Sequence, residues 1–186
     1  MYDEGAFEGI ANNILAVVRN CFEDRPCQDG QLEFFVSHGR PPADCCCFAA
    51  VWLRNVRPTR SGSFPFQVEN FVRPCEELEL IMNWVVTLRR SCSSPPAWDL
   101  SPGGQVRIPS DQYSVMHTNG LALLRDANVL FCCMKDAWDR GILTGQDGGA
   151  FSDEQIAWDA LEPYGPDGGC AGWDLSFLVG APACDC

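Results

Sequence analysis

The sequence predicts an α+β fold: a mostly antiparallel sheet of about four strands, with an N-terminal helix and one long helix packed on it. Residues 77–92 alternate apolar and mixed side chains with a period of two, which is typical of a long half-buried strand. Residues 110–140 instead repeat apolar side chains every three or four positions, as a helix does. A chain of 186 residues, 46% of them hydrophobic, suits one domain with a single core, spanning residues 1–186.

The first part of the chain predicts a helix followed by two strands. Residues 5–22 form the helix, whose apolar side chains recur at helical spacing: Ile10, Ile14, Val17, Val18 and Cys21. The turn signal Asp29-Gly30 comes after this element, and a short strand is expected at residues 32–37. Residues 45–57 form the next strand. Because both of its faces are mainly apolar, we expect it in the centre of the sheet.

The long strand at residues 77–92 is the element on which the predicted fold depends. Its apolar face consists of Leu78, Leu80, Met82, Trp84, Val86 and Leu88. The helix at residues 110–140 is the candidate to cover that face, since it would span about 45 Å from its N-cap at Ser110. Its apolar stripe consists of Met116, Gly120, Leu123, Leu124, Ala127, Leu130, Phe131, Met134 and Trp138.

Two long connections join these elements. Residues 58–76 are predicted to form a hairpin loop that contains several apolar side chains: Phe64, Phe66, Val68, Phe71 and Val72. These side chains need a partner surface, and a neighbouring copy of the chain and the chain's own sheet are equal alternatives. Residues 141–169 form an acidic, glycine-rich insertion in which a capping box at Ser152 opens a short helix that ends at Leu161. Residues 171–180 alternate again and predict the last strand.

The net charge of −12 argues against sequence-independent nucleic-acid binding, which needs clustered Lys and Arg. An acidic channel surface would instead repel DNA, so that DNA could pass through the channel without binding to it. No apolar run approaches the roughly 20 residues of a membrane span, and the N-terminus lacks the basic start of a signal peptide. We therefore expect a soluble protein that is made in the cytosol and does not bind membranes.

The chain contains 12 cysteines but no C-x-x-C spacing, and His38 and His117 have no ligand-spaced partner, so a zinc site is poorly supported. Cys132 and Cys133 lie in the long apolar helix and are predicted to be core thiols.

A hairpin of the two central strands raises the question of a disulfide. If Val56 lies opposite Ile81, Cys45 falls opposite Cys92, where a disulfide and two free thiols are both open alternatives. A slip of one residue would place Cys46 or Cys47 there instead.

Catalytic motifs are missing from the sequence. It contains no G-x-S-x-G, G-x-x-x-x-G-K, H-E-x-x-H or strand-linked G-x-G-x-x-G pattern. Cys45 and His38 are the only cysteine–histidine pair near in sequence, without further support for catalysis. We expect no enzymatic activity and no cofactor.

Several segments, in order along most of the chain, resemble one protein family. GRPPADC occupies residues 39–45 before a strand, VVTLRRSC closes the long strand at residues 85–92, Arg125-Asp126 lies in the long helix, and GGCAGW at residues 168–173 leads into the last strand. With the N-terminal helix, this arrangement resembles the tail-terminator proteins of long-tailed bacteriophages, especially phages of GC-rich actinobacterial hosts. The order of the elements is also similar to that family's fold.

The resemblance implies a non-enzymatic virion protein of the tail–neck region, assembled in the host cytoplasm. It would form a homo-oligomeric ring, typically a hexamer, that ends polymerisation of the tail tube. Its partners would be the major tail tube protein and the head–tail connector or stopper protein, and DNA would pass nearby without specific binding. Subunits would contact one another through sheet edges and the hairpin loop, with Phe64, Phe66, Val68, Phe71 and Val72 as interface anchors.

The acidic insertion has two interpretations within this resemblance. Its candidates to face the channel are Asp147, Asp153, Glu154 and Asp159. The alternative is that these acids only keep the protein soluble. The insertion and the number of cysteines are departures from compact members of the family.

Two other classes of protein compete with this interpretation. Another neck component, such as a head-to-tail adaptor or stopper, is the first alternative, although those proteins tend to be all-helical or barrel-like. A redox or metal protein is the second, and stoichiometric zinc in purified protein would favour it.

Overall fold

The protein is described by a computed structural model covering residues 6–27, 30–42, 47–60, 62–66, 78–91, 99–100, 106–107, 110–143, 156–167 and 170–182. The elements in chain order are α1 (Ala6–Phe22), β1 (Glu33–Ser37), β2 (Phe48–Arg60), β3 (Leu78–Ser91), β4 (Asp99–Leu100), β5 (Val106–Arg107), α2 (Ser110–Asp139), β6 (Ile156–Asp167) and β7 (Cys170–Pro182).

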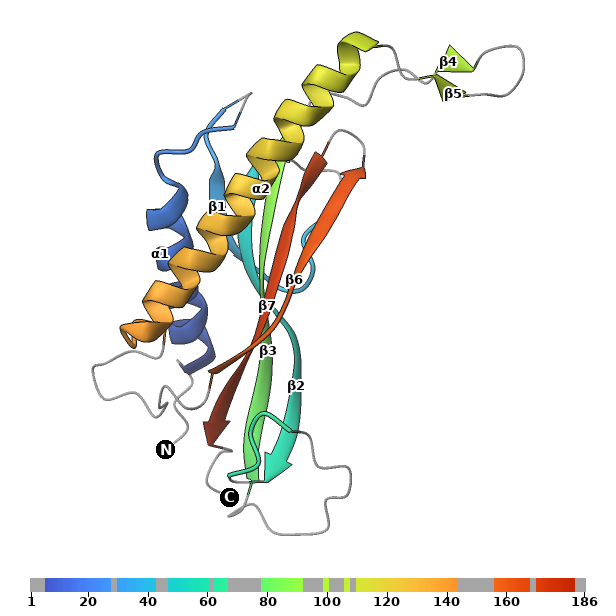
Figure 1. Cartoon of the computed structure of the whole chain (residues 1–186). Coiled ribbons are helices and arrows are strands. Elements are labelled where there is room, and N and C mark those ends of the chain that lie inside the picture. Colours follow the sequence, from blue (N-terminus) through green and yellow to red (C-terminus); the bar gives the residue numbers. More distant parts are fainter. Residues whose placement is uncertain are drawn as a thin grey trace.

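The main sheet has five strands in the order β1-β2-β3-β7-β6, and β4 and β5 form a separate two-stranded ribbon. β1 runs parallel to β2, whereas the other three neighbouring pairs are antiparallel. Both helices pack on the same face of the sheet, as Figure 1 shows. The α+β class is therefore confirmed, but the prediction of about four strands is wrong, and the sheet is partly parallel.

The predicted apolar face of β3 forms the centre of the core. Met82, Trp84, Val86 and Leu88 are buried against α1 and α2, and Leu80 packs at their margin. The neighbouring strand β7 contributes the face predicted for it, with Leu175, Phe177 and Val179 buried and Trp173 partly buried. β2 lies between β1 and β3, in the interior of the sheet as predicted.

A β-bulge changes the predicted register between β2 and β3. From Phe48 to Leu53 the strands pair regularly, but the register shifts between Leu53 and Asn55. Val56 consequently lies opposite Met82 and not opposite Ile81 as predicted. The strand also continues to Arg60, three residues into the predicted loop at residues 58–76. Cys45 and Cys92, the predicted disulfide, lie outside the described residues.

The short helix predicted from Ser152 to Leu161 is wrong, since β6 begins at Ile156 and pairs antiparallel with β7. Trp158 explains the difference, because its ring packs against Phe131, Trp138 and Phe177 with centroid separations of 5.4, 5.4 and 5.9 Å. Pairing with β7 and this aromatic packing outweigh a local capping signal. The predicted insertion at residues 141–169 thus contains an edge strand of the sheet.

A disulfide joins the two helices, between Cys21 of α1 and Cys133 of α2. Cys133 is therefore not the core thiol that was predicted, and Cys132 is an exposed free thiol. The two side chains differ because consecutive helical residues point about 100° apart, so only one of them can face α1. The bridge spans 112 residues of sequence, a long loop whose closure restricts the unfolded chain.

Gly172 is the position in β7 where the sheet has no room for a side chain. It lies opposite Arg89, and a Cβ atom there would meet the carbonyl oxygen of Leu88 at 1.8 Å. We expect Gly172→Ala to lower the free energy of unfolding by about 3 kcal/mol, because backbone would have to move. Gly120→Ala is the matched control: nothing lies within 4 Å of its added methyl, and helix propensity predicts a gain of about 0.5–1 kcal/mol.

Urea denaturation of both variants measures this difference. Equal stability of the two variants would show that β3 and β7 do not approach as closely as described.

Candidate subunit interface

The ends of β2 and β3 extend beyond both helices, as Figure 1 shows. We call this region the hairpin arm and define it as residues 56–60, 62–66 and 78–80. The buried Thr59 hydroxyl donates a hydrogen bond of 2.7 Å to the Phe66 carbonyl, and the Gly62 amide donates one of 3.3 Å to a carboxylate oxygen of Glu79. These contacts hold the described part of the connection against the strands.

The phenylalanines predicted as interface anchors differ in their exposure. Phe66 is 75% exposed, whereas Phe64 is half-buried. The Phe66 backbone is thus held by Thr59 while its ring remains in solvent, and Val56 on β2 adds a second exposed apolar side chain to the arm. Val68, Phe71 and Val72 lie outside the described residues.

The amino-terminal part of α2 presents a second apolar surface, and the predicted apolar stripe included only Met116 of its exposed apolar side chains. We call residues 110–121 the α2 overhang. Its exposed apolar side chains are Tyr113, Val115, Met116 and Leu121. The predicted stripe is buried only further along the helix, at Ala127, Leu130 and Met134, and Leu124 of that stripe is 60% exposed. The prediction that the stripe is covered by the sheet is therefore wrong for Met116 and Leu124, and also for Phe131, which is exposed.

An ion pair determines where α2 meets the sheet. Arg90, next to the last residue of β3, donates a hydrogen bond of 2.9 Å from Nε to Asp126 of α2. Its Nη1 atom also donates to the carbonyl oxygens of Arg25 and Pro26, at 2.7 and 3.2 Å, in the turn after α1. The α2 overhang precedes this contact, and its 12 residues form a helical segment about 18 Å long.

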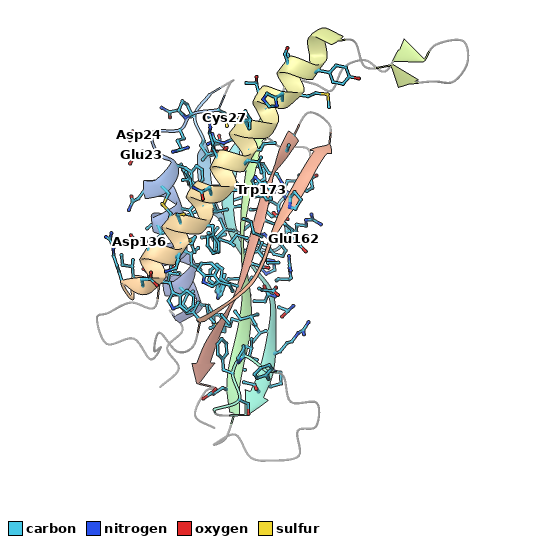
Figure 2. The ribbon with its side chains drawn as sticks, viewed as in Figure 1. Glu23, Asp24, Cys27, Asp136, Glu162 and Trp173 are labelled. Carbon is cyan, nitrogen blue, oxygen red and sulfur yellow. A yellow bond between two sulfur atoms is a disulfide. The ribbon has the colours of Figure 1, made fainter. Side chains whose placement is uncertain are left out.

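A hydrogen bond from β7 marks the same boundary. The Trp173 indole nitrogen donates to the carbonyl oxygen of Leu123 at 2.8 Å, and Figure 2 shows Trp173 on β7 beside α2. Amino-terminal to this contact, no side chain described at residues 113–121 is buried. The overhang therefore follows from the anchoring of α2 near Leu123 and Asp126.

The face of the sheet opposite the helices carries a chain of polar contacts. The Arg89 guanidinium donates to Asp174 at 2.8 Å, the Thr87 hydroxyl donates to the same carboxylate oxygen at 2.8 Å, and the Trp52 indole donates to Thr87 at 3.0 Å. The Tyr164 ring lies 3.8 Å from the Arg89 guanidinium carbon. Burial lowers the pKa of Arg89, and the Asp174 carboxylate opposes that shift.

These groups connect four strands and their polar atoms are directed at one another. Arg89 also donates to the carbonyl oxygens of Leu88 and Trp173, both at 3.1 Å. The other carboxylate oxygen of Asp174 lies 3.7 Å from the exposed Arg40 guanidinium, outside the sheet. Matched donors and acceptors of this kind stabilise the order of the strands. The cluster is therefore a structural feature of the sheet.

The acidic candidates for a channel surface are only partly described. Asp159 lies exposed on the edge strand β6, where it accepts a hydrogen bond of 3.0 Å from the Ser176 hydroxyl. Asp147, Asp153 and Glu154 lie outside the described residues. Asp159 thus belongs to a strand and not to the predicted helix, which places its carboxylate at a sheet edge.

Within the described part of the chain, no group of three or more His, Cys, Asp or Glu side chains could hold a metal ion. No described helix is both long and apolar enough to cross a membrane.

Comparison with known proteins does not assign the chain to a family. No protein-family model matches the sequence, and no curated protein matches it significantly.

The Arg90–Asp126 pair provides a test of how α2 is anchored. Asp126→Ala would remove a carboxylate from a pair with side chains only 11% exposed, and we expect a loss of about 3–5 kcal/mol in the free energy of unfolding. Asp136→Ala is the control, because Asp136, labelled in Figure 2, forms an exposed ion pair with Arg140. An exposed pair of this kind contributes at most about 0.5 kcal/mol to the free energy of unfolding.

Thermal and urea unfolding of the two variants give the comparison. Similar small losses in both would mean that the buried pair does not hold α2 on the sheet.

Proposed function

We propose that the protein is a structural, non-enzymatic virion protein that forms a ring at the head-proximal end of a phage tail tube. The ring ends tail polymerisation and joins the tail to the head connector. The observation that carries this proposal is the hairpin arm, which projects beyond the helices and exposes Phe66. An exposed phenylalanine on a fixed backbone suits an anchor in a protein interface, where aromatic side chains are enriched.

The two exposed apolar surfaces support a ring more than a two-fold dimer. The hairpin arm and the α2 overhang lie at opposite ends of the molecule in Figure 1, and they differ in sequence and shape. If the arm of one copy contacts the next copy on a different surface, the contact is head-to-tail, and such contacts generate closed rings when the rotation closes. We take six as the number of copies from the resemblance to tail terminators.

The charge of the chain is consistent with a channel through which DNA passes. With a net charge of −12, the protein would repel the phosphate backbone and let DNA move without specific binding. Asp159 on the exposed edge strand β6 is the described candidate to face that channel, with Asp147, Asp153 and Glu154 as the further candidates.

The partners of the ring follow from this position. One side would bind the major tail tube protein, and the other would bind the head–tail connector or stopper protein. The ring would assemble in the host cytoplasm and remain in the neck of the virion. An α+β fold with a five-stranded sheet favours this role over all-helical or barrel-like neck components.

Phe66→Ser tests the proposed interface. An aromatic anchor of this kind contributes about 2 kcal/mol or more to association, so the concentration needed for assembly should rise by about 30-fold or more. Phe7→Ser is the matched control, since Phe7 is an exposed phenylalanine on α1 and is not one of the residues that define the arm. Light scattering over a concentration series measures the mass of each species, and circular dichroism checks that both variants fold.

Negative-stain electron microscopy of the wild type should show rings with a central channel, alone or with purified tail tube protein. A wild-type protein that stays monomeric under both conditions would overturn the proposal. So would assembly that Phe7→Ser and Phe66→Ser weaken equally.

A further inference from the structure

Two free thiols meet where the turn after α1 approaches the start of β2. Cys27 lies in that turn and is labelled in Figure 2, and Cys47 lies immediately before β2. Phe48, the residue after Cys47, lies opposite Arg89 of β3, and the Nη1 atom of the next residue, Arg90, lies 3.9 Å from the Cys27 sulfur. Both cysteines therefore lie beside the end of β3, and both are half-buried. Twenty residues of sequence separate them, so their contact is a product of the fold.

The backbone on both sides of this contact is held by hydrogen bonds. The Cys27 amide donates to the Gly30 carbonyl at 2.9 Å, and the Glu33 amide, at the start of β1, donates to the Cys47 carbonyl at 3.0 Å. Arg90 holds the turn through the carbonyl oxygens of Arg25 and Pro26, and its Nη1 atom lies 3.9 Å from the Cys27 sulfur. The two cysteines are therefore kept adjacent by the strands and not by chance contact of loose loops.

We propose that Cys27 and Cys47 are an oxidation site, at which a second disulfide forms between the α1–β1 turn and β2. The inference goes beyond the proposed function and does not depend on it. The Cys21–Cys133 bridge lies at the end of α1, six residues before Cys27, so an oxidant that forms that bridge meets this thiol pair as well. A second bridge would cross-link the turn to the sheet, as the first one cross-links α1 to α2.

The chemistry requires a disulfide oxidant, for which oxidised glutathione is the probe. The Cys47 thiol loses its proton, and its sulfur attacks one sulfur of oxidised glutathione. This attack forms a mixed disulfide between Cys47 and glutathione and displaces the other glutathione as a thiolate. The Cys27 sulfur, after losing its proton, attacks the Cys47 sulfur and displaces the second glutathione thiolate. Two electrons pass from the protein to the oxidant, and the two protons are taken up by the two glutathione thiolates or by buffer.

The environment of Cys27 determines this order of attack. Burial, with contributions from Cys47, raises the pKa of the Cys27 thiol to about 11, so at neutral pH it is protonated and a poor first nucleophile. Once Cys47 is in a mixed disulfide, it no longer contributes to the raised pKa of Cys27. The Arg90 guanidinium, which lowers that pKa, remains beside the sulfur.

Disulfide mapping of the full-length protein tests the proposal. The protein is incubated with oxidised glutathione at pH 8, alkylated without reduction and digested with chymotrypsin, which can cut after Phe22, Phe34 and Phe48 and so places Cys27 and Cys47 on separate peptides. Mass spectrometry should detect a linked pair of these peptides. Cys132, an exposed free thiol, should be alkylated in the same sample and serves as the internal control.

Two variants assign the partner, because Cys45 and Cys46 are on the same peptide as Cys47. The double variant Cys45→Ser/Cys46→Ser should retain the link to Cys27, and Cys47→Ser should lose it. Should Cys47→Ser fail to fold, the double variant still decides the matter, since Cys47 is then the only cysteine on that peptide.

Before oxidation, Cys27 should react with the alkylating reagent at pH 8 about 100-fold more slowly than an unperturbed thiol. The reason is that its pKa is raised from 9.0 to about 11, which lowers the fraction of thiolate by about that factor. The proposal is overturned if Cys27 remains free after oxidation in the wild type or in the double variant. A link to Cys27 that persists in Cys47→Ser would also overturn it.

Discussion

Two consecutive arginines at the end of β3 connect the layers of this protein. Because neighbouring side chains of a strand point to opposite faces, Arg89 lies on the open face of the sheet and Arg90 on the helical face. Arg89 binds Asp174 of β7, and Arg90 binds Asp126 of α2, each with little exposure to solvent. A buried guanidinium is tolerated only with a matched acceptor, so these pairs specify which strand and which helix lie beside β3. The rest of the arrangement depends on that choice.

The position of α2 bears on the proposed assembly. Since Asp126 is held at the end of β3, the carboxyl-terminal part of the helix covers the core and the amino-terminal part extends past the sheet. At the other end, β2 and β3 extend past the helices as the hairpin arm (Figure 1). The molecule therefore has two unlike ends with exposed apolar side chains. Unlike ends favour repeated head-to-tail contacts, which is the geometry of the proposed ring.

The cysteines contribute to the same corner of the fold. Cys21 and Cys133 bond α1 to α2, Cys27 and Cys47 meet beside Arg90, and Cys170 at the start of β7 is also disulfide-bonded. Cross-links near the buried arginines restrain the elements that those ion pairs bring together. A small core covered on one face by two helices gains from such restraint, because it limits the freedom of the unfolded chain.

The sequence by itself determined those helices and strands that a repeating pattern of neighbouring residues identifies. Alternation predicted β3 and β7, and helical spacing predicted α1 and α2, because side-chain periodicity follows from local backbone geometry. The tertiary structure alone decided that residues 156–167 pair with β7 as a strand, that a bulge follows Leu53 and that β1 runs parallel to β2. It also decided which half of α2 is buried and which cysteines meet. These features depend on contacts between residues far apart in the chain, and no local pattern contains that information.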